Sequence, residues 1–214
     1  MVELLSYTPN ADSLCAEAAS ICYDAKNPQA ALETAMSGGH ESVIEHACFT
    51  FKISDVSRVL LAQITRHRLA SFSVQSQRYV DASNDASYIP KGIVGTTFQD
   101  LCEAHIKKSL AMYQTMVDDG IPKEDARYIL PQSMTTKIIV TMNARELRHF
   151  LKLRCCNRAQ KEIRDVADQM YRLAYPKAPI ILRNAGPGCI RGKCQECHPC
   201  GKPRTAEELK GIVN

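Results

Sequence analysis

One stretch of the sequence, RHRLASFSVQSQRY at residues 66–79, concentrates hydrogen-bond donors without any carboxylate. It contains three arginines, one histidine, three serines and two glutamines, and Asp and Glu are absent throughout residues 56–80. Guanidinium groups stay protonated and hold phosphate through paired hydrogen bonds, whereas serine and glutamine side chains suit the polar edge of a heterocycle. The stretch therefore predicts a local anion site.

Two further segments carry arginines that could join this site: Arg127 in EDARYILP, and residues 143–154. The alternative to an anion site is that the three segments are solvent-exposed helix faces, because charged helix faces usually contact only water. A solvated face would more often mix in Asp and Glu, and irregular backbone rich in donors is how loops bind anions. These two details favour the anion site.

The elements that must position these residues follow from hydrophobic periodicity and capping residues. Helices are expected in residues 10–24, 28–37, 55–69, 98–120, 121–131 and 157–176, and strands in residues 48–54 and 133–142. Asn143 and Glu146 have the spacing of a capping box, so another helix should begin at that asparagine. Residues 71–95 read as a long connection.

The strands are few and do not alternate regularly with helices, which favours an α+β fold over a doubly wound one. We expect one domain over residues 1–183, with a small mixed or antiparallel sheet flanked by helices, followed by a Cys-rich C-terminal extension over residues 184–214. The sequence contains neither GxGxxG nor GxxxxGK[ST], so any nucleotide is held in another way.

Composition limits the class of protein. The chain has 214 residues, of which 45% are hydrophobic and 23% are charged, as in a folded globular protein. A net charge of +4 is too modest to predict a nucleic-acid binder by itself. No apolar run reaches the length of a membrane span and no export signal is evident, so we expect a cytoplasmic protein whose ten cysteines are reduced.

The residues also resemble a known family. RHR followed by AS and then SQRY is similar to the RHRxxS signature, with its downstream SxR, of flavin-dependent thymidylate synthases. The resemblance continues in GHESVIEH, ARYILP, TMNARELRHFLKLR and RAQKEIR, in the family's order, and covers residues 39–164.

The resemblance implies sites for FAD and for dUMP. The residues implied to contact FAD are Ser42, Arg66, His67, Arg68, Val74, Asn143, Ala144, Arg145 and His149. Those implied for dUMP are Gln63, Ile64, Thr65, Arg66, Val74, Gln75, Ser76, Gln77, Arg78, Arg127 and Arg154. His40 and Glu45 match positions near the flavin edge and the folate entry.

The implied reaction is reductive methylation of dUMP to dTMP, with methylenetetrahydrofolate as the one-carbon donor and FAD reduced by NADPH as the hydride donor. The family builds its sites across the subunits of a homotetramer. Arg154 matches the arginine at the pyrimidine, where a fixed cation favours loss of the N3 proton and makes C5 more nucleophilic. Arg154 is therefore the expected catalytic residue.

The sequence departs from the family pattern at several positions. Val74 stands where many members have glutamate and Ser73 where many have asparagine, so contacts from these side chains are in doubt and backbone contacts at Val74 are expected. His149 replaces an asparagine of some members and can still donate from a ring nitrogen. Arg158 stands where some relatives have histidine.

The cysteines allow further hypotheses. Cys155 and Cys156 follow Arg154, but no paired base is evident and the resemblance implies no cysteine nucleophile, so packing or interface roles are expected. In the extension, two C-x-x-C steps have the ligand spacing of a zinc knuckle, and the candidate ligands are Cys189, Cys194, Cys197 and Cys200. Free thiols and a disulfide are the alternatives.

A function of another class is an RNA-binding module with a basic patch at residues 58–78 and a zinc knuckle at the C-terminus. Such a module needs aromatic stacking platforms, and the patch offers only Phe72 and the adjoining Tyr79, with no Trp in the chain. An enzyme that does not bind nucleic acid or membrane is the favoured interpretation.

Overall fold

The structure is a computed structural model that describes residues 1–82 and 86–211. Parts of two expected segments lie outside the described residues: residues 83–85 of the connection and residues 212–214 of the extension. Within the described part of the chain, no helix is both long and apolar enough to cross a membrane.

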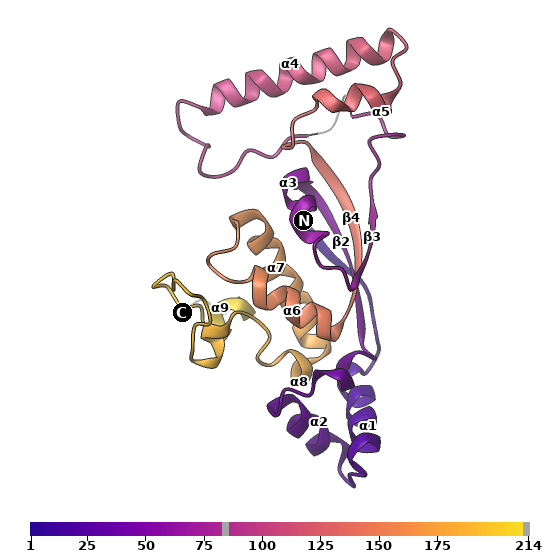
Figure 1. Cartoon of the computed structure of the whole chain (residues 1–214), viewed down its shortest axis with the longest axis vertical. Coiled ribbons are helices and arrows are strands. Elements are labelled where there is room, and N and C mark those ends of the chain that lie inside the picture. The colour runs from indigo at the N-terminus through magenta and orange to yellow at the C-terminus, as the bar shows by residue number, and fades with distance from the viewer. Residues whose placement is uncertain (83–85, 212–214) are drawn as a thin grey trace. The chain divides into compact units, whose positions relative to one another are not determined.

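The strands form one antiparallel sheet, as the α+β prediction requires (Figure 1). In the described residues they are β1 (Val2–Tyr7), β2 (Cys48–Ser57), β3 (Ala70–Val74) and β4 (Thr135–Asn143), in the order β1-β2-β4-β3. The alternation predicted for β2 is confirmed, because Phe49, Phe51 and Ile53 are all fully buried.

The chain divides into two compact units. The first contains Met1, Ile53–Arg66 and Ser73–Ile138, and the second contains Val2–Lys52, His67–Phe72 and Ile139–Asn214. The helices of the first unit are α3 (Arg58–Ile64), α4 (Gln99–Asp118), α5 (Lys123–Ala126) and the 3-10 helix η2 (Arg127–Ile129). Those of the second are α1 (Ala11–Tyr23), α2 (Pro28–Ser37), η1 (Glu41–Ile44), α6 (Ala144–Arg154), α7 (Lys161–Ala174), η3 (Tyr175–Lys177), α8 (Pro179–Leu182), η4 (Gly188–Arg191) and α9 (Ala206–Lys210).

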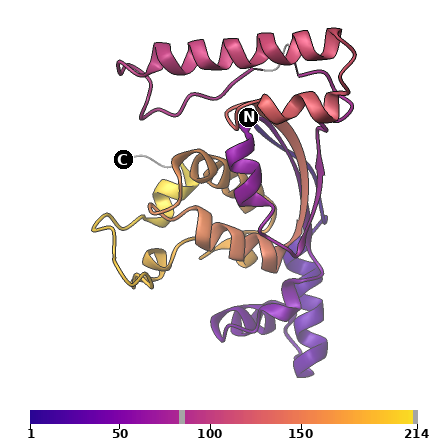
Figure 2. The same cartoon turned by 45° about the horizontal axis from the view of Figure 1, so that its top comes forward.

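Local signals explain the helices of the first unit. Ser57 caps α3 by accepting a hydrogen bond from the backbone N–H of Leu60. The long helix α4 runs beside α5, as Figures 1 and 2 both show, and Gly120 takes a positive φ where α4 has ended. Tyr113 of α4 is fully buried and its hydroxyl accepts from the backbone N–H of Ala82, which fixes the connection against this helix.

In the second unit, α6 begins where β4 ends. The Asn143 side chain accepts a hydrogen bond from the backbone N–H of Glu146 at 2.9 Å, which confirms the predicted helix start. Helix α7 packs against α6 and β1 through a stripe of buried residues at helical spacing that includes Ile163, Val166 and Met170. Residues 184–211 also belong to this unit.

Two strands were not expected. β1 and the first residues of the expected connection, β3, are strands at the two edges of the sheet. An edge strand pairs on one side only and is less buried, so its residues need no strict alternation of apolar and polar types. β1 is mostly exposed after Val2, and β3 contains Ser71 and Ser73. Neither strand could therefore be predicted from a hydrophobic pattern.

Candidate functional site

His67, the middle residue of the Arg-His-Arg triplet, lies at the centre of a buried polar chain in the second unit. Its Nδ1 atom lies 2.8 Å from a carboxylate oxygen of Glu146, and its Nε2 atom accepts a hydrogen bond of 3.2 Å from the Nε of Arg154. The His67 ring packs edge to face on Phe150, with 5.0 Å between the ring centroids. The structure thus brings together two residues predicted from separate motifs, His67 and Arg154.

This arrangement defines the protonation state of His67. Because an arginine can only donate, Nε2 must accept, and the ring proton resides on Nδ1 and is donated to Glu146. Burial lowers the pKa of His67 below its ordinary value, and the cation of Arg154 lowers it further, while Glu146 opposes both. A neutral imidazole therefore holds the Arg154 guanidinium in a fixed orientation.

Helix α6 carries most of the predicted flavin residues of this unit. Asn143 is its N-cap, Ala144 is buried and bonds through its N–H to the carbonyl of Ala47 at 2.7 Å, and His149 lies with its ring centroid 5.7 Å from that of His67. Arg154 is the last residue of the helix. A single helix thus places the expected flavin contacts at its start and the expected catalytic arginine at its end.

The GHESVIEH segment, residues 39–46, is held against α6 by two ion pairs. Arg145 donates to Glu45 at 2.5 Å, and Arg148 donates to Glu41 at 2.9 Å. Ser42 and the neighbouring His40 belong to this same segment. Arg148 is buried, which lowers its pKa, although the charge of Glu41 acts in the opposite direction. The ion pairs fix a segment that was expected to face the flavin.

Three residues of this site were missed at the level of sequence: Glu41, Glu146 and Arg148. Glu146 was noticed only as a capping residue, yet its carboxylate lies against His67. The only available signal was that Glu146 and Arg148 sit near Arg145 on a helix expected to be functional. Glu146 pairs with His67, 79 residues away in sequence, and Arg148 pairs with Glu41, 107 residues away, so both pairings depend on the fold.

In the first unit, Arg78 and Arg127, two of the arginines implied to contact dUMP, both donate hydrogen bonds to Glu124. The Nε of Arg78 donates to the Glu124 carboxylate at 2.7 Å, and the Nε of Arg127 donates to the Glu124 backbone carbonyl at 3.1 Å. Both interactions are exposed to solvent. Arg78 and Arg127 therefore both contact Glu124, one through its side chain and the other through its backbone.

The segment before Arg78 is a turn held by side-chain contacts rather than a helix, as expected. Arg58 donates to the backbone carbonyl of Gln75 at 3.1 Å, and the Ser76 hydroxyl accepts from the backbone N–H of Arg78 at 3.1 Å. The side-chain nitrogen of Gln77 is buried and has no hydrogen-bond partner among the described residues. A buried donor left unpaired costs about 1–3 kcal/mol.

The remaining predicted nucleotide residues have different degrees of access. Arg66 and Arg68, on either side of His67, are exposed. Gln63 is partly buried on α3, and the Thr65 hydroxyl donates to the carbonyl of Leu61. Ile64 is fully buried, backbone included. Val74 ends β3.

The cysteines show no arrangement for nucleophilic catalysis or metal binding in the described part of the chain. Cys155 is fully buried and burial raises its pKa well above the ordinary value, as does the charge of Asp168, which suits packing rather than attack. No three His, Cys, Asp or Glu side chains of the described residues are grouped to hold a metal ion. Zinc at Cys189, Cys194, Cys197 and Cys200 stays a prediction.

The class of protein that this fold and site define is an α+β protein with clustered arginines. The family model described as "Thymidylate synthase complementing protein" matches residues 3–180. A flavin-dependent thymidylate synthase of Geobacter sulfurreducens is 45% identical, covering 97% of each chain, and one of Clostridium tetani is 38% identical, covering 99% of this chain and 96% of the relative. One of Pyrococcus furiosus is 46% identical over 74% of this chain and 69% of its own.

The chain therefore belongs to the family of flavin-dependent thymidylate synthases, which are enzymes. The resemblance inferred from the arginine motifs is confirmed.

Proposed function

We propose that this enzyme methylates dUMP to dTMP, with methylenetetrahydrofolate as carbon donor and with FAD that is reduced by NADPH. Family membership supports the reaction class. The observation that supports the residue assignments is the hydrogen-bonded chain from Glu146 through His67 to Arg154. The RNA-binding alternative is not carried forward, because the family consists of enzymes.

In this proposal Arg154 acts on the pyrimidine ring. Its positive charge stabilises the negative charge that develops when N3 loses its proton, and this charge makes C5 a better nucleophile. Neutral His67 fixes the guanidinium through Nε2, and Glu146 fixes His67 through Nδ1. The cation is thus aligned before the substrate binds, so that little reorganisation is needed during the reaction.

The residues at the start of α6 fit an anionic cofactor such as FAD. Asn143 and Ala144 lie at the positive end of the helix dipole, which favours an anion such as a pyrophosphate, and Arg145 adds an exposed cation. When bound, FAD would supply the hydride for the methylation. Arg66, Arg68 and Ser42 would add donors to the same cofactor, and His149 would donate from its ring.

The dUMP phosphate would bind to Arg78 and Arg127, which already converge on Glu124. Gln77 would satisfy its unpaired side-chain nitrogen on the nucleotide. Gln63, Thr65, Arg66 and Val74 to Ser76 would complete the site, with backbone groups contributing at Val74. His40 and Glu45 would lie toward the folate, and the site would be completed by neighbouring subunits of a homotetramer.

Substitution of Arg154 tests the proposal. We expect Arg154→Ala to lower kcat for dTMP formation about 100-fold or more while purified protein stays yellow, because one lost transition-state donor typically costs that much. Arg183→Ala is the matched control, since Arg183 is an exposed arginine paired with Glu33. A colourless wild-type protein that gains no flavin spectrum on adding FAD would refute the cofactor assignment. Near-normal turnover of Arg154→Ala would move the catalytic role elsewhere.

A further inference from the structure

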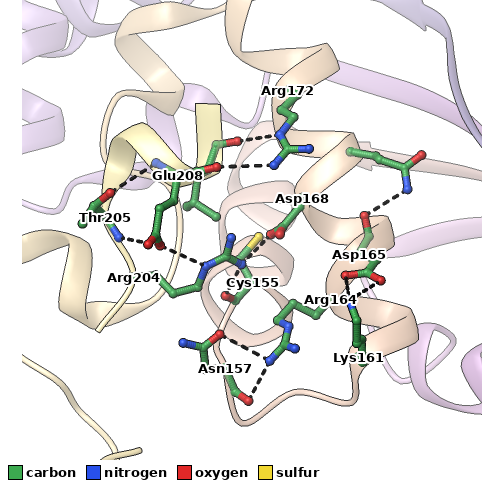
Figure 3. Close-up of polar contacts among 12 residues, drawn as sticks. Cys155, Asn157, Lys161, Arg164, Asp165, Asp168, Arg172, Arg204, Thr205 and Glu208 are labelled. Atoms are coloured by element: carbon green, nitrogen blue, oxygen red, sulfur yellow. Dashed lines mark hydrogen bonds and ion pairs between the residues drawn. The ribbon is translucent and has the colours of Figure 1, made fainter. Parts of the chain in front are cut away.

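The C-terminal extension is folded onto α7 through its own short helix. Thr205 and Glu208 form a reciprocal capping box that starts α9, and Arg172 of α7 donates to the carbonyls of Leu209 and Glu208 (Figure 3). Leu209 is fully buried. Thr205, Glu208 and Leu209 lie beyond residue 180, where the match to the family model ends.

Arg204, just before this helix, links the extension to both α7 and the end of α6. One guanidinium nitrogen, Nη1, donates to the Asp168 carboxylate at 2.8 Å and to the backbone carbonyl of Cys155 at 3.0 Å (Figure 3). The side chains of Arg204 and Asp168 are only 11% and 12% exposed. Although burial lowers the pKa of Arg204, the bond and charge of Asp168 outweigh it and raise the pKa.

The bond to Cys155 is the contact of interest, because Cys155 is the C-cap of α6 and directly follows Arg154. The last carbonyls of a helix have no partner within the helix, and a cation there is favourable to the helix dipole. Arg204 supplies both the donor and the charge. It therefore holds the backbone one residue away from the expected catalytic side chain.

Two further bonds tie the following residues to the extension. The Asn157 side chain donates to the carbonyl of Lys202 at 2.7 Å, and Arg158 donates to the carbonyl of His198 at 2.6 Å. A cavity of about 250 Å³ separates this segment from the extension, with Leu153 and Cys156 on one side and Pro203 on the other. Because packing there is incomplete, the hydrogen bonds carry much of the positioning.

We propose that Arg204 is a positioning residue for Arg154: it fixes the end of α6 so that the Arg154 guanidinium reaches both His67 and the pyrimidine. The inference rests on the proposed role of Arg154. A displacement of about 1 Å in a catalytic group can lower a rate about 100-fold. Loss of Arg204 should therefore lower kcat more than it raises the KM for dUMP.

Three variants of the full-length enzyme test this role. Arg204→Ala removes the link, Arg204→Lys keeps a cation that can donate to both oxygens, and Arg172→Ala is the matched control. Arg172 also binds the extension to α7, but its bonds go to Glu208 and Leu209 and not to α6. For each variant we would measure kcat, the KM for dUMP, bound flavin and the midpoint of thermal unfolding.

We expect Arg204→Ala to lower kcat about 10- to 100-fold with the KM for dUMP changed less than threefold and flavin retained. Arg204→Lys should recover part of kcat. The kcat of Arg172→Ala should stay within threefold of the wild-type value, even if its unfolding midpoint falls as much as that of Arg204→Ala. A kcat of Arg204→Ala within twofold of wild type, or an equal loss in Arg172→Ala, would overturn the proposal.

If Arg204→Ala does not fold, Arg204→Lys and Asp168→Asn, compared with Arg172→Ala, decide the question by the same criteria. Asp168→Asn keeps the size of the side chain and removes the charge that holds Arg204. Failure of the proposed function is separate: it shows as normal turnover in Arg154→Ala or as no dTMP formation by wild type, whatever the Arg204 variants do.

Discussion

Arg78, a proposed phosphate-binding residue, forms an ion pair with Glu124. Its guanidinium lies 2.7 Å from Glu124, and both side chains are about half exposed, at 51% and 48%. An exposed pair of this kind contributes only about 0–1 kcal/mol, so a phosphate can replace the carboxylate at little cost. Glu124 thus competes with the substrate for the proposed phosphate site.

Removing this competitor should strengthen nucleotide binding. We expect Glu124→Gln to lower the Kd for dUMP about two- to fivefold, which corresponds to an exposed ion pair of about 0.5–1 kcal/mol. Isothermal titration at low and high salt measures it. The control is Glu33→Gln, which breaks the exposed pair with Arg183 and should leave the Kd unchanged. Weaker binding by Glu124→Gln would mean that Glu124 supports the site rather than competing for it.

The site could be predicted from sequence only where its residues share a motif. The Arg-His-Arg triplet and the SQRY motif identified His67 and Arg78 because both residues lie in one donor-rich stretch, residues 66–79. The partners Glu146 and Glu124 could not be identified, because a carboxylate next to a helical arginine is the normal composition of a solvated surface. Only the three-dimensional structure shows that Glu146 contacts His67 and that Glu124 contacts Arg78.

Helix α6 combines a structural cap with a proposed cofactor contact at one residue, Asn143. The side-chain oxygen of Asn143 satisfies the backbone N–H of Glu146, and the same residue is expected to contact FAD. The two roles require different chemistry. An oxygen acceptor is enough for the cap, whereas a pyrophosphate tolerates an amide but not a second negative charge.

Two substitutions should separate these roles. Asn143→Ala should lower the free energy of unfolding by about 1 kcal/mol, because the helix loses its cap. Asn143→Asp keeps an acceptor, so we expect nearly wild-type stability but weaker flavin binding from charge repulsion. Urea unfolding of the flavin-free protein and flavin fluorescence titration measure the two quantities. Unchanged FAD affinity in Asn143→Asp would place the pyrophosphate away from this helix start.

Elements with strong local signals were predicted, and those that depend on their neighbours were not. β2, α4 and α6 carry clear periodicity or a cap, and each begins within two residues of its expected start. β1 and β3 are defined by pairing with β2 and β4, and this pairing leaves little trace in their own residues. Because β3 lacks a local pattern of its own, its residues 71–74 were assigned to the expected connection.

For the molecule as a whole, the ten cysteines differ in their exposure to solvent. Burial, together with the charge of Asp12, raises the pKa of Cys15 to about 11, and burial also raises the pKa of Cys155 well above the ordinary value. Exposed thiols are found at both ends of the chain, for example Cys22 and Cys200. Since the thiolate is the reactive form, reactivity should divide along the same line.

A thiol titration tests this division and the three hypotheses for the extension. At pH 8 we expect the folded protein to expose its surface thiols to an aromatic disulfide reagent while Cys15 and Cys155 stay unreacted. The protein denatured without reductant should show all ten thiols. Fewer than ten would indicate a disulfide, and a rise in native reactivity when a chelator is added, with zinc found by elemental analysis, would indicate a metal site.

The second unit is made of three separate pieces of the chain. Its first helix, α1, is hydrogen-bonded to α8, which lies in the third piece. Asp12 at the start of α1 accepts hydrogen bonds from the backbone N–H groups of Ile180 and Ile181, which are 168 and 169 residues away in sequence. During synthesis, Asp12 leaves the ribosome long before its partners exist. The unit can therefore close only when the chain is almost complete, and its folding should be slow because it waits for distant contacts.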